Sequence, residues 1–554
     1  MRPMSRAMLA LLPIPFACFV FAAATPQDPR PSTLQPLGPG PSWRGPVTPS
    51  GANEVFATGD GCAMCHSASP NAMAMRSPTG DDVSPHGLWQ ATMMANSFRD
   101  PYWRAQVAKE ASANPQRAHE VTSLCLKCHA PMAHHTAKLG GLPSPTIEAA
   151  AADPLARDGV SCTVCHQAQA DGLGTDKTFS GNLQIARGRT IFGPYEDPAS
   201  QPMTMHSGYT AAHGAHISKS ALCAACHTLV THHAGKPFPE QTPYFEWRNS
   251  VFNDEAGATE TSRTCQQCHM PNQGGVRIAR NPGGREFNIP VRPDYAAHVF
   301  AGGNAFMLDL LRANAKELGV TASPEALARN ATITRRQLLD HTTKLTISAP
   351  RRADGKLAFD VAIENLTGHK FPTGYPARRA WLQVEVRAGR DVLFRSGGFD
   401  ADGRITGVAD ERRIEHHDVV EREDQVVVYE CVPVDPDGEP TTFLTRMSKM
   451  GKDTRLLPKG WKSDGPHALE TAPVGVDGDP DFAAGGDVVH FEIPLAADAP
   501  KVLVVAWVRY QSVPPSWVEP LRTVDADEAR AFVRMYDAAG KTPETAGLAA
   551  RTED

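Results

Sequence analysis

Ten cysteines of this 554-residue chain occur in five copies of one pattern, Cys-x-x-Cys-His. The cysteine pairs are Cys62 and Cys65, Cys125 and Cys128, Cys162 and Cys165, Cys223 and Cys226, and Cys265 and Cys268, followed by His66, His129, His166, His227 and His269. In c-type haem attachment, this spacing carries both thiols on one turn, where they bond the porphyrin, and brings the adjacent histidine to the iron. The five copies therefore predict five covalently attached c-type haems, each with its motif histidine as an iron ligand.

Other uses of paired cysteines fit the pattern less well. Structural zinc takes paired Cys-x-x-Cys units, so five units would leave one over and would not explain the five trailing histidines. A thioredoxin-like motif occurs once, in a strand-helix-strand context. A disulfide framework would not place the partners of every pair three positions apart. Cys431 lies outside the motifs and is expected to be a small buried residue.

The supply of further histidines bears on function, because an electron carrier usually coordinates its iron on both faces. The chain has 21 histidines, and those outside the motifs exceed the five that full coordination requires. A haem that binds a small molecule instead leaves one face open. His369, held between Gly368 and a proline-containing turn, is expected to reach back and cap a haem. Arg378 and Arg379 beside it either meet haem propionates or lie on the surface.

Composition restricts the class of protein. The chain is 41% hydrophobic and 21% charged, a composition typical of globular proteins. Its formal charge of −6 makes it mildly acidic. Nucleic-acid binders usually carry a basic footprint, so nucleic acid is not expected as a partner. The 45 glycines and 47 prolines indicate many loops.

The first residues have the pattern of a targeting segment. Arg2 and Arg6 precede an apolar run that ends in small residues near Ala24, so residues 1–24 are predicted to be a secretory signal peptide. The alternative is a retained membrane anchor, which Pro13 and Pro15 disfavour. Residues 25–50 are proline-rich and are expected to form an extended linker. No later stretch is long and apolar enough to span a membrane, so the mature protein is expected to be exported, in the periplasm of a bacterium.

The rest of the chain divides into parts with different patterns. Residues 51–343 are expected to form a mainly α, loop-rich multihaem cytochrome domain. In residues 344–515, apolar and polar residues alternate in short runs separated by turns, which predicts an all-β sandwich of the immunoglobulin-like type. Residues 516–554 are predicted to form a C-terminal helix and tail. The strands are expected at 345–347, 357–363, 381–386, 426–432, 488–493 and 502–508. The predicted fold class is therefore a multidomain α+β protein, with the β-domain as a scaffold or partner surface.

Several segments together resemble exported multihaem cytochromes of the cytochrome c-554 type, which are related more loosely to pentahaem nitrite reductases and octahaem hydroxylamine oxidoreductases. The resemblance rests on Ser84–Trp89, Glu240–Trp247, Cys265–Pro271, His298 with its Gly-Gly-Asn, Gly368–Pro376 and Tyr510–Pro515, and so covers most of the mature chain. It implies distal iron ligands at His86, His206, His216, His298 and His369. The nitrite reductases use Cys-x-x-Cys-Lys at their active haem, and this sequence has no such motif.

The function expected from these features is electron transfer through a chain of mostly bis-histidine haems, with redox partner proteins. The alternative is a multihaem oxidoreductase of the nitrite or hydroxylamine type, acting on a small nitrogen or sulfur compound at one open haem. A third hypothesis is a binding module, in which the β-domain recruits a partner that the haems serve. The sequence leaves the oligomeric state open.

Overall fold

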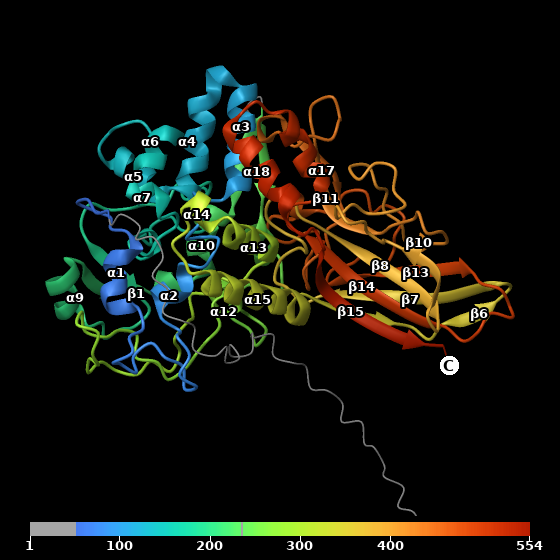
Figure 1. The fold of residues 1–554 in the computed structure, drawn as a ribbon, viewed down its shortest axis with the longest axis horizontal. Coiled ribbons are helices and arrows are strands. Elements are labelled where there is room, and N and C mark those ends of the chain that lie inside the picture. Colours follow the sequence, from blue (N-terminus) through green and yellow to red (C-terminus); the bar gives the residue numbers. More distant parts are fainter. Residues whose placement is uncertain (1–50, 234–235, 554) are drawn as a thin grey trace, which may run out of the picture.

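The computed structural model describes residues 51–233 and 236–553. The predicted signal peptide and proline-rich linker lie outside the described residues. The fold is mixed α+β: a region of short helices and long loops adjoins a region of two larger β-sheets (Figure 1). None of the helices in the described part of the chain has the length and apolar character needed to cross a membrane.

The helical region contains short helices that are mostly separated by loops. They are α1 (Gly59–His66), α2 (Pro85–Trp89), α3 (Pro101–Ala113), η1 (Pro115–Arg117), α4 (Ala118–His129), α5 (Pro131–Leu139), α6 (Ile147–Ala152), α7 (Pro154–Arg157), α8 (Cys162–Cys165), α9 (Ser200–Ser207), η2 (Ala215–Ser218), α10 (Ser220–His227), α11 (Pro243–Arg248), α12 (Cys265–His269), α13 (Ala305–Ala313), α14 (Ala315–Leu318) and α15 (Pro324–His341). Two small sheets accompany them: β1 (Thr190–Gly193) parallel to β2 (Thr210–His213), and β3 (Leu229–His233) antiparallel to β4 (Lys236–Gln241).

Several helices begin where side-chain caps favour them. Asp100 accepts hydrogen bonds from the Tyr102 and Trp103 backbone amides at the start of α3, and proline follows at the first helical position. Ser84 and Ser323 cap α2 and α15 in the same way. These caps fix where each helix begins, and α2 thereby carries His86 in its first turn.

The β-region consists of two sheets that share one apolar core. Its strands are β5 (Thr343–Ile347), β6 (Arg351–Ala353), β7 (Lys356–Asn365), β8 (Arg379–Ala388), β9 (Asp391–Ser396), β10 (Val419–Val420), β11 (Val428–Val434), β12 (Lys449–Asp453), β13 (Gly486–Pro494), β14 (Leu503–Gln511) and β15 (Glu544–Thr552). One sheet has the order β10-β13-β7-β5 with β6 beside β7, and the other has the order β12-β11-β8-β14-β15 with β9 beside β8. All neighbours are antiparallel except β10 and β13.

Burial alternates along the strands as the sequence pattern requires. In β7, Leu357, Phe359, Val361 and Ile363 are buried while their neighbours are half-exposed. These residues pack in one cluster with the inward side chains of β8, β13 and β14. All six predicted strand segments are strands in the structure, with ends that differ by a few residues. The predicted burial of Cys431, on β11, is confirmed.

The last part of the chain joins both regions. It contains α17 (Pro515–Val518), η4 (Glu519–Thr523) and α18 (Asp527–Ala538). Two further short helical segments lie earlier, within the β-region: η3 (Leu444–Arg446) and α16 (Ala468–Thr471). Helix α18 packs on α3, where Phe532 and Tyr102 have ring centroids 5.1 Å apart. Strand β15 then pairs with β14 at the edge of the second sheet, so the chain end is part of the β-region.

A buried ion network also joins the two regions. The Lys370 ammonium lies 2.7 Å from a carboxylate oxygen of Asp453, and Arg455 binds both Asp453, at 2.7 Å, and Glu246 of α11, at 3.2 Å. The Lys370 backbone amide donates to Glu246 at 3.0 Å. The loop that contains His369 is thereby fixed against the helical region.

Candidate functional site

All five Cys-x-x-Cys-His motifs lie at the ends of helices. Helices α1, α4, α10 and α12 end at their motif histidines, and α8 spans Cys162–Cys165 with His166 as its C-terminal cap. Residues three apart lie on the same face of a helix, so each pair of thiols faces one side. The histidine that follows lies at the helix end, where it can turn toward the same space.

The motifs surround one continuous cavity. Its volume is about 2210 Å³, and all ten motif cysteines and all five motif histidines line it. Protein interiors have few voids larger than a water molecule, and a pocket for one small ligand has ~300–1,000 Å³. The cavity therefore has room for several groups of porphyrin size, next to the residue types that attach them.

Four motif histidines share one hydrogen-bonding arrangement. Their Nδ1 atoms face backbone carbonyl oxygens: His66 with Ile278 at 2.8 Å, His129 with Ser97 at 3.0 Å, His166 with Phe192 at 2.7 Å and His269 with Ala301 at 2.5 Å. A carbonyl oxygen only accepts, so Nδ1 carries the proton and Nε2 keeps its lone pair. Histidines that bind metals are usually oriented in this way.

Burial also keeps the motif histidines neutral. It lowers the pKa of His129 to about 4, although the Ser97 carbonyl opposes the shift. Burial, with His269 and Arg378, lowers the pKa of His227 to about 4, and burial lowers the pKa of His66, His166 and His269 as well. The neutral imidazole is the form that binds a metal ion.

Two motif histidines each face a histidine from elsewhere in the chain. The rings of His166 and His298 have centroids 6.4 Å apart at an interplanar angle of 20°, and those of His269 and His369 are 6.3 Å apart at 12°. Two imidazoles that each bond one metal ion at ~2.0–2.1 Å hold their centroids about 6 Å apart. Among the described residues, a facing histidine at this spacing is found for these two motifs.

His298 and His369 repeat the orientation of the motif histidines. Nδ1 of His298 faces the Ala296 carbonyl oxygen at 3.0 Å, and Nδ1 of His369 faces that of Lys370 at 2.8 Å. Burial, together with His166, lowers the pKa of His298 to about 3, and burial lowers the pKa of His369. Both rings are therefore neutral and can offer Nε2 to the cavity.

The other three histidines implied by the resemblance lie in different environments. His86 lines the cavity beside α1, and burial lowers its pKa. His206 lines the cavity from α9 and is exposed. His216 does not line it, and its Nε2 faces the Ala168 carbonyl oxygen at 2.9 Å. The structure thus brings four of the five residues to the cavity.

Four further histidines, which were not predicted as iron ligands, also line the cavity. They are His119, His232, His341 and His467. His341 ends α15, and His467 stacks on Phe245 with ring centroids 3.8 Å apart. Neither lies near a motif in the sequence, so only the fold reveals them. His119 lies six residues before Cys125 on the same helix, and His232 lies five residues after His227, so their closeness to a motif was the signal available for these two.

The two arginines beside His369 have different surroundings. Arg378 lines the cavity and donates to the Thr373 carbonyl oxygen at 2.8 Å. Arg379 is buried away from the cavity lining, where it binds Glu411 and Gln511 at 2.9 Å each. Of the two, Arg378 is thus the one placed to meet a ligand of the cavity.

Neighbouring motifs contact one another through their cysteines. Helices α1 and α8 are in contact, and the thiols of Cys62 and Cys162 are close enough to lower the pKa of Cys62 and to raise that of Cys162. Two other thiol pairs across motifs, Cys128 with Cys226 and Cys265 with Cys223, behave in the same way. Val164 and Cys165 of the third motif share an apolar cluster with Ala225 and Cys226 of the fourth. The fourth motif therefore touches the second, third and fifth, and the third touches the first.

Comparison with known proteins gives one distant structural similarity. No family model matches the chain, and no curated protein matches it significantly. The fold is similar to a crystal structure of a penta-heme cytochrome c552 from Thermochromatium tepidum, with a TM-score of 0.44 and 18% sequence identity. The match covers 77% of this chain and 83% of that one.

Proposed function

We propose that this chain carries five c-type haems and transfers electrons along them. The observation that carries the proposal is the single cavity lined by all five motifs. The orientation of the motif histidines supports it, because four of them direct Nδ1 to a carbonyl and leave Nε2 for a metal ion.

The residues present fit the group. Each cysteine pair would hold a porphyrin through two thioether bonds, and each motif histidine would bind its iron. His298 and His369 would bind the irons of the third and fifth motifs from the opposite face, as the ring spacings support. When bound, such haems supply one-electron redox chemistry.

The chain's own part is to hold the five attachment points in a contiguous and largely dry arrangement. Electron tunnelling falls steeply with distance, so contact between successive motifs favours transfer along the series. The contacts described above connect the first, third, fourth and fifth motifs in a row, with the second beside the fourth. Under this proposal, the fourth motif is the branch point of the path.

The alternative, an oxidoreductase with one open haem, is supported by a specific observation. His66, His129 and His227 have no facing histidine ring at the spacing found for the other two motifs, among the described residues. Polar groups that could serve such a site have structural partners: the Tyr244 hydroxyl donates to Glu255 at 2.8 Å, and Arg248 pairs with Glu255 at 3.4 Å. Several cavity histidines are available as sixth ligands, so we favour the carrier.

Location and partners follow from the same proposal. Covalent haem attachment takes place outside the bacterial cytoplasmic membrane, so the protein would be exported to the periplasm. Its partners would be redox proteins. Haem propionates would add negative charge to a chain that already has a formal charge of −6, which favours partners with a basic docking surface.

A low-temperature electron paramagnetic resonance spectrum of the oxidised holoprotein tests the proposal. The carrier predicts that all the irons are low-spin and that nitrite and cyanide leave the spectrum unchanged. A high-spin iron whose signal changes on adding nitrite would support the oxidoreductase instead. Integration against the total haem concentration assigns each signal to a number of irons.

A further inference from the structure

Three segments of the β-region bring two histidines and several aspartates together. His416 and Asp418 lie in the loop before β10, Asp479 and Asp481 lie in the loop before β13, and Asp487 and His490 lie on β13 itself. The side chains fall into two groups of the same composition, each with one histidine and two aspartates. None of these six residues lines the haem cavity.

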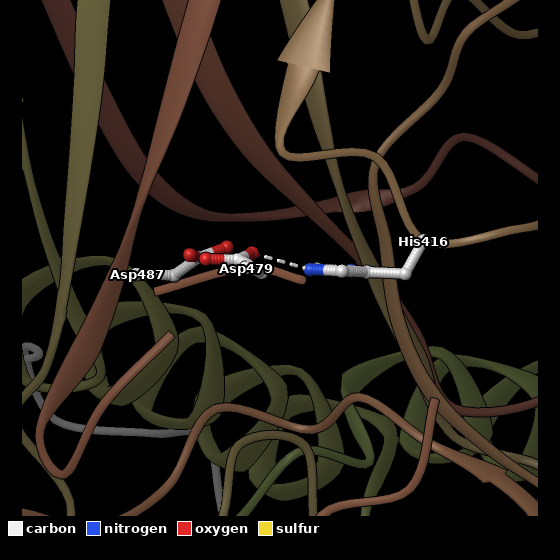
Figure 2. A group of neighbouring side chains, drawn as sticks. All are labelled: His416, Asp479 and Asp487. Atoms are coloured by element: carbon white, nitrogen blue, oxygen red, sulfur yellow. Dashed lines mark hydrogen bonds and ion pairs between the residues drawn. The ribbon is translucent and has the colours of Figure 1, made fainter. Parts of the chain in front are cut away.

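The first group is buried and compact. Possible ligand atoms of His416, Asp479 and Asp487 all lie within 4.8 Å of one another. Nε2 of His416 is 2.6 Å from Oδ2 of Asp479, and these side chains are 5% and 2% exposed. Figure 2 shows the two carboxylates side by side, with the imidazole directed at them.

One oxygen of this group has no partner. Asp487 is 3% exposed, and its Oδ2 accepts a hydrogen bond from the Tyr429 hydroxyl at 2.7 Å. Its Oδ1 is buried without a hydrogen-bond partner, and Figure 2 shows that this carboxylate points toward Asp479. An unpartnered carboxylate beside a second one is costly without a cation.

The second group, Asp418, Asp481 and His490, also has carboxylate oxygens without a hydrogen-bond partner, Oδ1 of Asp418 and Oδ1 of Asp481, but it is more exposed and its histidine is already paired. His490 faces Asp360 through Nδ1 at 2.8 Å and Asp481 through Nε2 at 3.1 Å, so both ring nitrogens have partners. The side chains of Asp418, Asp481 and His490 are 25%, 34% and 38% exposed. The hydrogen bonds to Asp360 and Asp481 raise the pKa of His490 although burial opposes them, so this imidazole is already held by two acidic partners.

We propose that His416, Asp479 and Asp487 bind one divalent cation of the zinc class, at a site separate from the haems. An imidazole ligand argues against Ca²⁺ and Mg²⁺, which take oxygen ligands. One histidine and two carboxylates suit Zn²⁺, with water as the fourth ligand. Two ligands of a tetrahedral zinc ion lie about 3.3 Å apart, so Nε2 of His416 and Oδ2 of Asp479, now 2.6 Å apart, would separate, and the more distant ligand atoms would approach by no more than about 1.5 Å.

Such an ion would fix two loops to the sheet. The loops that carry His416 and Asp479 come from separate parts of the sequence, and Asp487 joins them to β13. The Tyr429 hydroxyl extends the connection to β11 of the second sheet. The ion would therefore hold together both sheets and two loops, which is a structural role.

The test uses tag-free holoprotein and Zn²⁺ itself. After equilibrium dialysis against zinc in a buffer that contains excess Ca²⁺ and Mg²⁺, metal analysis is expected to show one tightly bound zinc per chain. The Asp487→Asn substitution keeps the shape of the side chain but removes a ligand charge. Outer partners of metal sites contribute about 10–100-fold in affinity, so loss of a direct ligand is expected to weaken binding by at least tenfold.

Asp418→Asn is the matched control, because it makes the same change in the neighbouring group and is expected to leave zinc affinity within about threefold. His416→Gln is a second ligand variant, and an unchanged haem spectrum and circular dichroism show that each variant is folded. Equal zinc binding by Asp487→Asn and the unaltered protein overturns the proposal. Retention of Ca²⁺ in place of zinc also overturns it. The absence of bound zinc does so too, and it would mean that the two aspartates share a proton instead of a cation.

Discussion

Replacing His369 with alanine tests the assignment of iron ligands directly. The ring faces His269 at 6.3 Å, so its removal is expected to leave the iron of the fifth motif with water or no ligand on that side. Weak-field coordination converts that iron to high spin. With five motifs in the chain, the expected change is one fifth of the total iron, with a matching loss of low-spin signal.

The surrounding loop is expected to survive this substitution, because two of the hydrogen bonds that hold it use the backbone of His369 and only the contacts of Nδ1 are lost. Its carbonyl oxygen accepts from Asn365 at 2.9 Å and from Thr367 at 2.8 Å, and alanine retains that oxygen. His298→Ala is the parallel variant for the third motif, and the double variant is expected to show two fifths of the iron as high-spin. Additivity is expected because the two histidines face different motifs.

The assay is quantitative electron paramagnetic resonance of the oxidised protein, with haem content per chain measured separately. His134→Ala is the control, because it removes an imidazole that hydrogen-bonds Ser144 at 3.0 Å and does not line the cavity. The control is expected to match the unaltered protein. Fully low-spin iron in the folded His369 and His298 variants would refute the reasoning, as would the same high-spin fraction in the control.

Two further predictions concern buried charge. Burial, with Glu110, raises the pKa of Glu240 to about 8 although Gln241 opposes the shift. Glu240 lies close enough to Cys125 and Cys128 to affect their pKa values. Its ionisation above pH ~8 would favour ferric iron at the second motif, so the potential of that haem should fall with pH by up to ~59 mV per unit. Glu240→Gln should abolish this slope in a spectroelectrochemical titration, and a slope that persists would contradict the assignment. Asp453→Asn leaves Lys370 and Arg455 without their shared carboxylate and should cost about 3–5 kcal/mol in denaturant unfolding, whereas Asp437→Asn on an exposed turn should cost little. A loss at Asp453 no larger than at Asp437 would show that the network does not stabilise the fold.

The same network gives the stability of the protein a pH dependence. Burial acts to raise the pKa of Asp453, but Arg455 and Lys370 together hold it at about 2. The folded-state pKa therefore lies below the unfolded value. Its contribution to stability is present above about pH 4 and is lost as the pH falls toward 2.

The sequence predicted those parts of the fold that depend on local pattern. The turn that carries each cysteine pair follows from the attachment spacing, and the strands of the two larger sheets follow from alternation, as in β7 and β13. Strand β15 was not predicted, because Glu544–Thr552 has three alanines and a glycine but no valine or isoleucine. It is a strand because β14 offers a free edge with which it pairs.

The candidate site, too, could be predicted from the sequence only in part. The motif cysteines and histidines could be named from the sequence, because the proposed attachment depends on residues three and four positions apart. The facing pairs could not, since His166 and His298 are distant in the chain and their approach depends on packing. The cluster of His416, Asp479 and Asp487 gave no signal for the same reason. A resemblance to known families pointed to His298 and His369, and only the fold indicates which motif each one faces.

Intact mass spectrometry of the denatured mature protein tests the central claim most directly. Thioether bonds survive denaturation, so the account predicts a coloured protein whose mass exceeds that of the mature polypeptide by five haems. Cysteine-to-serine substitution of both residues in one motif should remove one of the five. A colourless protein with the mass of the bare polypeptide, after expression with the haem-attachment machinery, would contradict the account.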